Sequence, residues 1–364
     1  RRVLFRSTSA AQKKYEPPIT WKQSGVLPVQ PNGLIHMGLS GVVSGVVGDQ
    51  IIIAGGNNFP EGLPWEGGIK KYYNRVIVYN NQKDTLLNTF TFNLPANVAY
   101  AAVAQLKDGI FYAGGENENG PLSSAYFIKK SKSQSFEIIE LPSLPIAISN
   151  AVAVATENAV YVLGGANKEG VSNKVWKLSL NNFKKGWTAQ ASMPQPTAFS
   201  AAAIANEHIY IMGGRCKEAN GISKIYKEVY AFDVENNFWE QKASLPETVS
   251  AACAVAIDNN KILFIGGDKI VVFHEVEMLA AKIAATADTT IKKELTVVKN
   301  NLQKTHPGFS KDVLAYDATL NKWSPYAQLN FTAPVTTSAF LFNHKILLPV
   351  GEIKPGIRTP YIWV

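Results

Sequence analysis

Five Gly-Gly doublets recur along this chain at intervals of about 50 residues, and no other feature limits its fold as strongly. Each doublet ends a short apolar run, such as Val160–Leu163, and a polar loop follows it. A run rich in Ala, Val and Ser precedes each doublet, as at Ala151–Ala155. The doublets lie at 55–56, 114–115, 164–165, 213–214 and 266–267. The period and the β-type runs predict one small antiparallel unit repeated within a single all-β domain.

A doublet at this period is typical of kelch-type propeller blades. After each polar loop comes an aromatic run, and a fourth run often carries a tryptophan, as at Trp187, Trp239 and Trp323. Four strands per copy match the antiparallel meander of a propeller blade. A sixth, degenerate copy ends at 350–351, where Val350 replaces the first glycine. We therefore expect an all-β, six-bladed kelch β-propeller over residues 15–364.

The two ends of the sequence complement each other. The last copy ends at Tyr361–Val364 without a fourth strand, whereas the segment around Trp21 has the character of a fourth strand without the preceding three. We expect the strand around Trp21 to pair with Pro360–Val364 and close the last blade, because closure removes exposed strand edges.

One insertion breaks the strand periodicity. Residues 275–303 contain two segments of helical character: Glu275–Ala285, and a later stripe with apolar residues at three- and four-residue spacing, which predicts an amphipathic helix. The stripe consists of Ile291, Leu295, Val298 and Leu302. Two roles remain open for this insertion: a helical excursion packed on the edge of a blade, or a lid or wall beside the mouth of the channel.

The net charge of +8 is concentrated at the N-terminus, where Arg1, Arg2, Arg6, Lys13 and Lys14 lie within residues 1–14. We expect this segment to be a signal remnant or a foreign tail. A removed signal indicates a periplasmic or otherwise exported protein, although a cytoplasmic location stays open. No run of about 18 apolar residues predicts a membrane span. No basic stripe with interleaved aromatic residues indicates nucleic-acid binding.

The cysteines and histidines predict no metal site. Cys216 and Cys253 are expected to be free thiols, because neither belongs to a Cys-x-x-Cys pattern. The five histidines are scattered along the chain without ligand spacing.

The degenerate sixth copy carries the strongest chemical signal. Glu352 follows its second glycine and Arg358 comes six residues later, in a loop that contains Pro355. A repeat that breaks its own pattern with a carboxylate and a guanidinium is a candidate for catalysis. The alternative is a salt bridge that only fixes the loop.

The residues that directly follow the doublets predict a wider polar cup. They should lie at similar height around one face of the propeller: Asn57, Glu116, Ala166, Arg215, Asp268 and Glu352. With Asn58, Asn167, Lys354 and Arg358 they could bind a polyhydroxylated anion. The alternative is that such positions only cap turns.

The segment Gly351-Glu-Ile-Lys-Pro-Gly-Ile-Arg-Thr359 resembles the Gly-Glu-x-Lys-Pro-Gly-x-Arg-Thr motif of the bacterial sialic acid mutarotases, also named N-acetylneuraminate epimerases. The loops Gly55-Gly-Asn-Asn-Phe-Pro60 and Pro64-Trp-Glu-Gly-Gly68 are similar to those of the cyclically permuted branch of that family. The resemblance covers nearly the whole chain from Trp21 onward. It implies a six-bladed kelch propeller that interconverts the α and β anomers of N-acetylneuraminate without metal or cofactor.

The same resemblance implies that Glu352 accepts and donates a proton and that Arg358 lies beside it. The implied partner is an anionic sugar, a sialic acid. Asn57, Asn58, Glu116, Asn167, Arg215 and Lys354 are the expected substrate-binding residues. The particular sugar and the oligomeric state stay open.

Three other functions would require different features of the sequence. A non-catalytic kelch module that binds a carbohydrate or a protein would show large exposed apolar residues on the loop face. A copper oxidase needs histidine and tyrosine ligands and a Cys–Tyr crosslink, which the scattered histidines do not favour. A hydrolytic sialidase needs an arginine triad and a tyrosine nucleophile, and the sequence has no Asp-box repeats.

Overall fold

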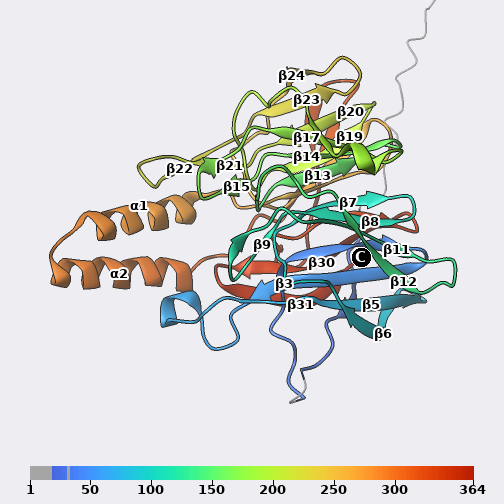
Figure 1. Cartoon of the computed structure of the whole chain (residues 1–364). Helices are drawn as coiled ribbons and strands as arrows, with labels where there is room; N and C mark the ends of the chain where they lie inside the picture. Colours follow the sequence, from blue (N-terminus) through green and yellow to red (C-terminus); the bar gives the residue numbers. More distant parts are fainter. Residues whose placement is uncertain (1–18, 31–32) are drawn as a thin grey trace, which may run out of the picture.

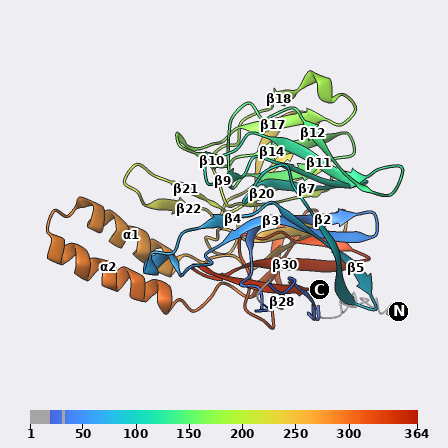
Figure 2. The same cartoon turned by 60° about the horizontal axis from the view of Figure 1, so that its bottom comes forward.

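Six β-sheets form the body of the molecule in the part of the chain that the structure describes (Figure 1). The structure is a computed structural model that describes residues 19–30 and 33–364. The tail expected at residues 1–14 lies outside them. A two-helix hairpin projects from one end of the propeller, and Figure 2 shows the same projection after rotation. The expected six-bladed propeller with a closing N-terminal strand and a helical insertion is confirmed.

The first three blades follow each other along the chain, with strands in the order inner to outer. Blade one contains β2 (Ser40–Val47), β3 (Gln50–Asn58), β5 (Arg75–Gln82) and β6 (Thr85–Asn93), with β4 (Lys71–Tyr72) paired to β3 and the 3-10 helix η1 (Pro64–Glu66) in its loop. Blade two contains β7 (Ala102–Leu106), β8 (Gly109–Ala113), β11 (Ala125–Lys130) and β12 (Phe136–Leu141), with a ribbon of β9 (Glu116–Asn117) and β10 (Gly120–Pro121). Blade three contains β13 (Val152–Ala155), β14 (Ala159–Leu163), β17 (Val175–Ser179) and β18 (Trp187–Ala189), with a ribbon of β15 (Ala166–Asn167) and β16 (Gly170–Val171) and the 3-10 helix η2 (Phe183–Lys185).

The last three blades carry the insertion and the closure. Blade four contains β19 (Ala201–Ala205), β20 (His208–Met212), β23 (Val229–Asp233) and β24 (Phe238–Lys242), with a ribbon of β21 (Arg215–Lys217) and β22 (Ser223–Ile225). Blade five contains β25 (Cys253–Ala256), β26 (Lys261–Ile265), β27 (Asp312–Asp317) and β28 (Lys322–Gln328), and the helices α1 (Val271–Ala285) and α2 (Thr289–Lys304) lie between β26 and β27. Blade six contains β29 (Phe340–Phe342), β30 (Lys345–Lys354), β31 (Ile357–Trp363) and β1 (Gln23–Val26).

The second strand of each blade explains the apolar runs in the sequence. Strands β8 and β14 are buried at every residue because a neighbouring blade covers each face. A strand covered on both faces needs a continuous apolar run rather than an alternating one. The tryptophans of the outer strands connect adjacent blades, since the indole N–H donates to a carbonyl just after the outer strand of the preceding blade. The pairs are Trp187 to Pro142 (2.7 Å), Trp239 to Ala191 (2.9 Å) and Trp323 to Ala243 (2.8 Å).

The N-terminal strand closes the ring as the sequence predicts. Strand β1 pairs antiparallel with β31, with Val26 opposite Tyr361. The backbones of Lys22 and Val364 exchange hydrogen bonds of 2.8 and 2.9 Å. Trp21 is buried and meets Phe331 edge to face at 5.8 Å between ring centroids. This closure leaves blade six with four strands from both ends of the chain.

The insertion consists of two helices, as expected for Glu275–Ala285 and the later stripe, but it begins earlier than expected, at Val271. Ile270, the residue before α1, has φ 90° and provides no side-chain cap, so the sequence carries no start signal there. Asp288 caps α2 by accepting from the Thr290 and Ile291 amides. The expected apolar stripe is only partly covered, because Ile291 and Val298 are exposed. Within the described residues, no helix is long and apolar enough to cross a membrane.

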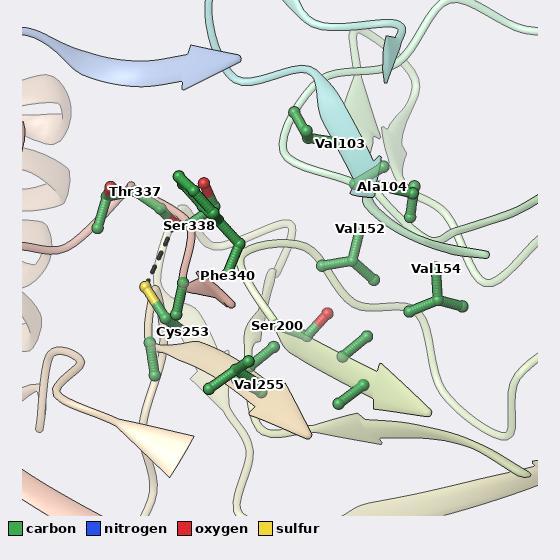
Figure 3. A pocket seen from close by; sticks show the side chains of 18 of the residues that line it. Val103, Ala104, Val152, Val154, Ser200, Cys253, Val255, Thr337, Ser338 and Phe340 are labelled. Atoms are coloured by element: carbon green, nitrogen blue, oxygen red, sulfur yellow. Dashed lines mark hydrogen bonds between the residues drawn. The ribbon is translucent and has the colours of Figure 1, made fainter. Parts of the chain in front are cut away.

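The innermost strands enclose a central channel of about 420 Å³ (Figure 3). Small and apolar side chains line it, including Ala104, Val152 and Val255. Cys253 donates to the Thr337 carbonyl at 3.3 Å, and burial raises the pKa of its thiol to about 12. Both cysteines are free, as predicted. No Asp, Glu, His, Lys or Arg among the described residues lines this channel, so these residues offer no group there that is poised for proton transfer near neutral pH.

Deletion of residues 1–27 should destabilise the protein strongly, because it removes β1 together with the buried Trp21 and Leu27. Truncation of a single buried tryptophan typically costs about 3–5 kcal/mol, and the exposed edge of β31 adds to the loss. Thermal unfolding followed by circular dichroism measures the effect. Deletion of residues 1–14 alone is the control, and equal melting temperatures for the two truncations would contradict the closure.

Candidate functional site

The six residues that follow the doublets occupy equivalent positions on one face. Each pairs through its backbone with a residue that precedes an innermost strand or begins one. The pairs are Ser40 with Asn57, Ala99 with Glu116, Ser149 with Ala166, Ala198 with Arg215, Ser250 with Asp268, and Val335 with Glu352. The sequence-based expectation that these positions lie at similar height is therefore met.

The residues at the start of the six innermost strands form a ring, and five backbone hydrogen bonds link them from blade to blade. Each donor and acceptor is a residue with positive φ at the start of an innermost strand. The bonds run from Gly41 N to Thr336 O, Tyr100 N to Gly41 O, Asn150 N to Tyr100 O, Phe199 N to Asn150 O, and Ala251 N to Phe199 O, at 2.7–3.0 Å. Members of this ring line both the central channel and a second cavity. The ring is thus the floor of the second cavity.

The second cavity has a volume of about 350 Å³, within the usual range of small-molecule sites. Four of the six post-doublet residues line it: Glu116, Arg215, Asp268 and Glu352. The base of the helical hairpin completes its wall through Phe273 of α1 and Gln303 of α2. The insertion therefore forms a wall of the cavity, and the rest of the hairpin projects outward (Figure 2).

Glu352 is held in a fixed orientation at the cavity wall. It lies opposite Arg358 in the β30–β31 pair, next to a bulge in the register. Its Oε1 accepts from the Gly356 amide at 2.7 Å and lies 3.5 Å from Arg358 Nη1. Gly356 turns the chain with φ 75°. Among the described residues no hydrogen bond is formed to Oε2, so that oxygen is the one available to a ligand.

Arg358 lies behind Glu352 and is buried. Its Nε donates to Ser40 Oγ at 3.2 Å and its Nη2 to Asn57 Oδ1 at 3.3 Å. The guanidinium also covers the Phe59 ring at 4.7 Å. Arg358 does not belong to the cavity lining, so the structure places it as a support for Glu352 rather than as a wall residue.

The expected substrate-binding asparagines do not face the cavity. Asn57 is fully buried and donates to the Ser40 carbonyl at 3.0 Å, while it also accepts from Arg358. Asn58 donates to the Gly38 carbonyl and accepts from the Tyr73 hydroxyl. Asn167 accepts from the Glu169 amide in its own turn. These side chains hold loops, as the turn-capping alternative predicts.

Lys354 also lies outside the cavity lining, so the structure brings only Glu116 and Arg215 of the expected binding residues to the wall. Glu116 accepts from Lys70 at 3.2 Å and from the Tyr72 hydroxyl at 2.7 Å. Burial and then the hydrogen bond to Glu116 raise the pKa of Tyr72 above its usual range. Tyr72 therefore stays protonated and acts as a donor.

Several cavity residues were not identified from the sequence, above all Lys70, Tyr100, Phe273 and His306. His306 is buried, and its Nδ1 accepts from the Gly308 amide at 3.0 Å. The proton of the neutral ring is therefore on Nε2. Burial lowers the pKa of His306, although the Asp268 and Glu352 carboxylates act in the opposite direction. Its position at the end of the insertion was the only available signal.

The described residues contain no group of three or more His, Cys, Asp or Glu side chains that could hold a metal ion. The arrangement offers instead a fixed carboxylate, a neutral imidazole and a guanidinium around one cavity. Such groups can transfer protons and bind an anion.

Sequence comparison shows that this chain is similar to proteins described as N-acetylneuraminate epimerases. A family model described as N-acetylneuraminate epimerase matches residues 141–364. The N-acetylneuraminate epimerase of Yersinia pestis (strain Pestoides F) is 26% identical over 230 residues, which cover 62% of this chain and 57% of the relative. That of Vibrio vulnificus (strain YJ016) is 28% identical over 226 residues, covering 60% and 57%. The N-acetylneuraminate epimerase 1 of Escherichia coli O6:H1 is 24% identical over 228 residues, covering 61% and 59%. The chain thus spans less than two thirds of the length of these relatives.

His306 should make the protein less stable in mild acid. Because its pKa is lowered in the folded state, the unfolded chain binds more protons below about pH 6.5, and stability falls as pH decreases through that window. His306→Gln should reduce this fall. Denaturant unfolding between about pH 7.5 and about pH 5 measures it.

His344→Gln, which changes an exposed turn histidine, is the control and should leave the pH dependence unchanged. His36 contributes part of the remaining fall, because burial also lowers its pKa. An unchanged pH dependence in His306→Gln would show that this imidazole is not held neutral by the fold.

Proposed function

We propose that this chain, which belongs to the N-acetylneuraminate epimerase family, interconverts the α and β anomers of N-acetylneuraminate by acid–base catalysis. The observation that carries the proposal is Glu352, a carboxylate fixed through Oε1 with Oε2 available, on the wall of a cavity of about 350 Å³. Membership of the family suggests the reaction, and Glu352 is the group on the cavity wall that can carry out its proton transfers.

Anomer exchange of a cyclic hemiketal requires proton transfers and a bond rotation. Glu352 Oε2 accepts the proton of the anomeric hydroxyl, and the bond between the anomeric carbon and the ring oxygen breaks as a carbonyl forms. The ring oxygen takes this proton from the Glu352 carboxyl and becomes a hydroxyl. After rotation the same hydroxyl attacks the other face of the carbonyl, and the transfers run in reverse. No electron is gained or lost, and every proton returns.

Two residues support this role. Arg358 keeps the Glu352 carboxylate aligned, since its own Nε and Nη2 are bonded to Ser40 and Asn57. His306 lies on the same wall as a neutral imidazole with its N–H on Nε2. That N–H can donate a hydrogen bond to the ring oxygen and polarise the bond that breaks, while the Glu352 carboxyl carries the proton.

The proposal also includes a cyclically permuted order of blades and an exported location. A cyclically permuted order of blades would give a colinear match that covers only part of the chain, as the match to residues 141–364 does. The exported location extends the expectation from the basic segment at residues 1–14, and the permuted branch extends the resemblance of the loops Gly55–Pro60 and Pro64–Gly68.

A second candidate function is a binding module without catalysis. The helical hairpin carries exposed apolar side chains that favour this alternative, namely Val271, Met278, Ile291, Val297 and Val298. The cavity and its fixed carboxylate favour the enzyme.

Glu352→Gln should slow anomer exchange by about 10²- to 10⁴-fold, because the amide keeps the shape but cannot accept the proton. Two-dimensional exchange NMR on N-acetylneuraminate measures the rate after subtraction of the uncatalysed rate, and calorimetry should give a nearly unchanged Kd. Glu157→Gln, at an exposed turn, is the control and should match the parent. Equal rates in Glu352→Gln and the parent would remove Glu352 from the mechanism, and a parent without acceleration would leave the binding module.

Arg358→Lys should lower kcat with little change in KM, because Arg358 contacts Glu352 and not the cavity. Lysine keeps the charge but loses the planar fork that serves Ser40 and Asn57. Steady-state anomer-exchange rates over a range of sugar concentrations separate the two constants. A raised KM at unchanged kcat would instead mean that Arg358 binds the sugar directly.

A further inference from the structure

Arg215 is held between two aromatic rings on the cavity wall. Its guanidinium carbon lies 3.9 Å from the centroid of Phe199 and 4.3 Å from that of Phe273. The three residues come from separate parts of the chain: β21, the start of blade four, and α1. Both faces of the planar group are covered, so only its edge can form hydrogen bonds.

The N–H groups at the edge of this guanidinium have few hydrogen-bond acceptors among the described residues. Within the described residues its side chain forms one hydrogen bond, a long contact of 3.5 Å from Nη1 to Ser250 Oγ, although the group carries five N–H donors. It forms no ion pair with any described residue. Arg215 is half-buried, and burial lowers its pKa. A partly buried cation without an ion-pair partner is stabilised when an anionic ligand binds beside it.

The nearby carboxylates form their hydrogen bonds with other groups and none forms an ion pair with Arg215. Asp268 accepts from the Ile270 amide, Glu277 accepts from the Ser223 amide and hydroxyl, and Glu352 accepts from Gly356. The other cation of the cavity, Lys70, is paired with Glu116 at 3.2 Å. Arg215 is therefore the cavity cation that remains available for an anionic ligand.

We infer that Arg215 binds the carboxylate of the sugar, and that α1 is part of this anion site because Phe273 covers one face of the guanidinium. This inference rests on the proposed function and assigns its specificity for a carboxylate-bearing sugar to Arg215 rather than Arg358. A planar fork can hold a carboxylate through two parallel hydrogen bonds, which gives orientation as well as affinity. The reacting carbon, bonded to that carboxylate, is then presented to the wall that carries Glu352.

Helix α1 is attached to the propeller close to the contact between Arg215 and Phe273. His274 donates from Nε2 to the Ser223 carbonyl at 2.7 Å, and Glu277 accepts from the Ser223 amide and hydroxyl at 2.8 Å. These bonds attach the first turns of α1 to β22, in the ribbon that also contains Arg215. The insertion thus has a defined role at its base, which is to position Phe273.

Calorimetric titration of the whole protein with N-acetylneuraminate and with its C1 methyl ester tests the inference. The ester keeps the sugar but removes the negative charge. The parent should prefer the acid, and Arg215→Gln should bind the acid about 10- to 100-fold more weakly while its ester affinity changes little. Arg215→Lys should show an intermediate preference, because it keeps a charge without the planar fork. Phe273→Leu should also lower the preference for the acid.

Arg75→Gln, which changes an exposed arginine on β5, is the matched control and should keep the parent's preference. The inference is overturned if Arg215→Gln and Arg215→Lys both retain the parent's preference, or if the parent binds neither ligand or binds both equally. Parent-like behaviour of Phe273→Leu overturns the part assigned to α1. A parent that prefers the acid through Arg215 but does not accelerate anomer exchange supports the anion site and contradicts the proposed function alone.

Discussion

The geometry of this propeller depends on one backbone contact that the Gly-Gly doublet makes possible. In four of the five doublets the amide of the second glycine donates to a carbonyl of the next blade, as from Gly165 to Thr197 at 2.9 Å, while Gly267 forms no such bond within the described residues. The first glycine passes so close to that carbonyl that a Cβ on Gly164 would lie 2.2 Å from it. Both glycines have positive φ, which other residues adopt only with strain. The contact joins the blades and sets the direction of the residue that follows, which is the residue that reaches the loop face.

The sixth blade keeps the contact and changes the chemistry around it. Gly351 still donates to the Leu39 carbonyl at 2.8 Å, although Val350 now occupies the first position with φ 44°. A β-branched residue in this region is strained by about 1–2 kcal/mol, and such strain concentrates at functional sites. The burial of the Val350 side chain in the adjoining core offsets part of that cost. The irregular blade is also the one that carries Glu352 and Arg358, and Glu352 lies on the wall of the second cavity.

The sequence predicted the features that repeat and missed those that do not. The doublets and the apolar runs were sufficient for the blades, and the unmatched strand around Trp21 was sufficient for the closure. The helical insertion was visible from its periodicity, but its start at Val271 was not, because nothing caps it. Among side chains, position along the chain indicated which residues reach the loop face. It did not indicate which of them turn into the cavity.

The contrast between Asn57 and Arg215 shows why. Both follow a doublet, yet Asn57 is fully buried under Arg358, while Arg215 lies between two rings at the cavity. The difference comes from Phe273 and Arg358, which other parts of the chain bring into place. The same holds for His306, a loop histidine that only the fold brings near Glu352. Side-chain contacts between distant parts of the chain leave no periodic signal in the sequence.

The central claim is that one cavity holds the sugar between an anion-binding arginine and a proton-transferring carboxylate. A crystal structure of the Glu352→Gln variant with N-acetylneuraminate tests it most directly, because slow turnover should preserve a single bound anomer. We predict the sugar carboxylate within hydrogen-bond distance of the Arg215 edge and the anomeric hydroxyl or ring oxygen within reach of residue 352. A sugar bound in the central channel, or with its carboxylate on Arg358 and away from Arg215, would contradict the claim.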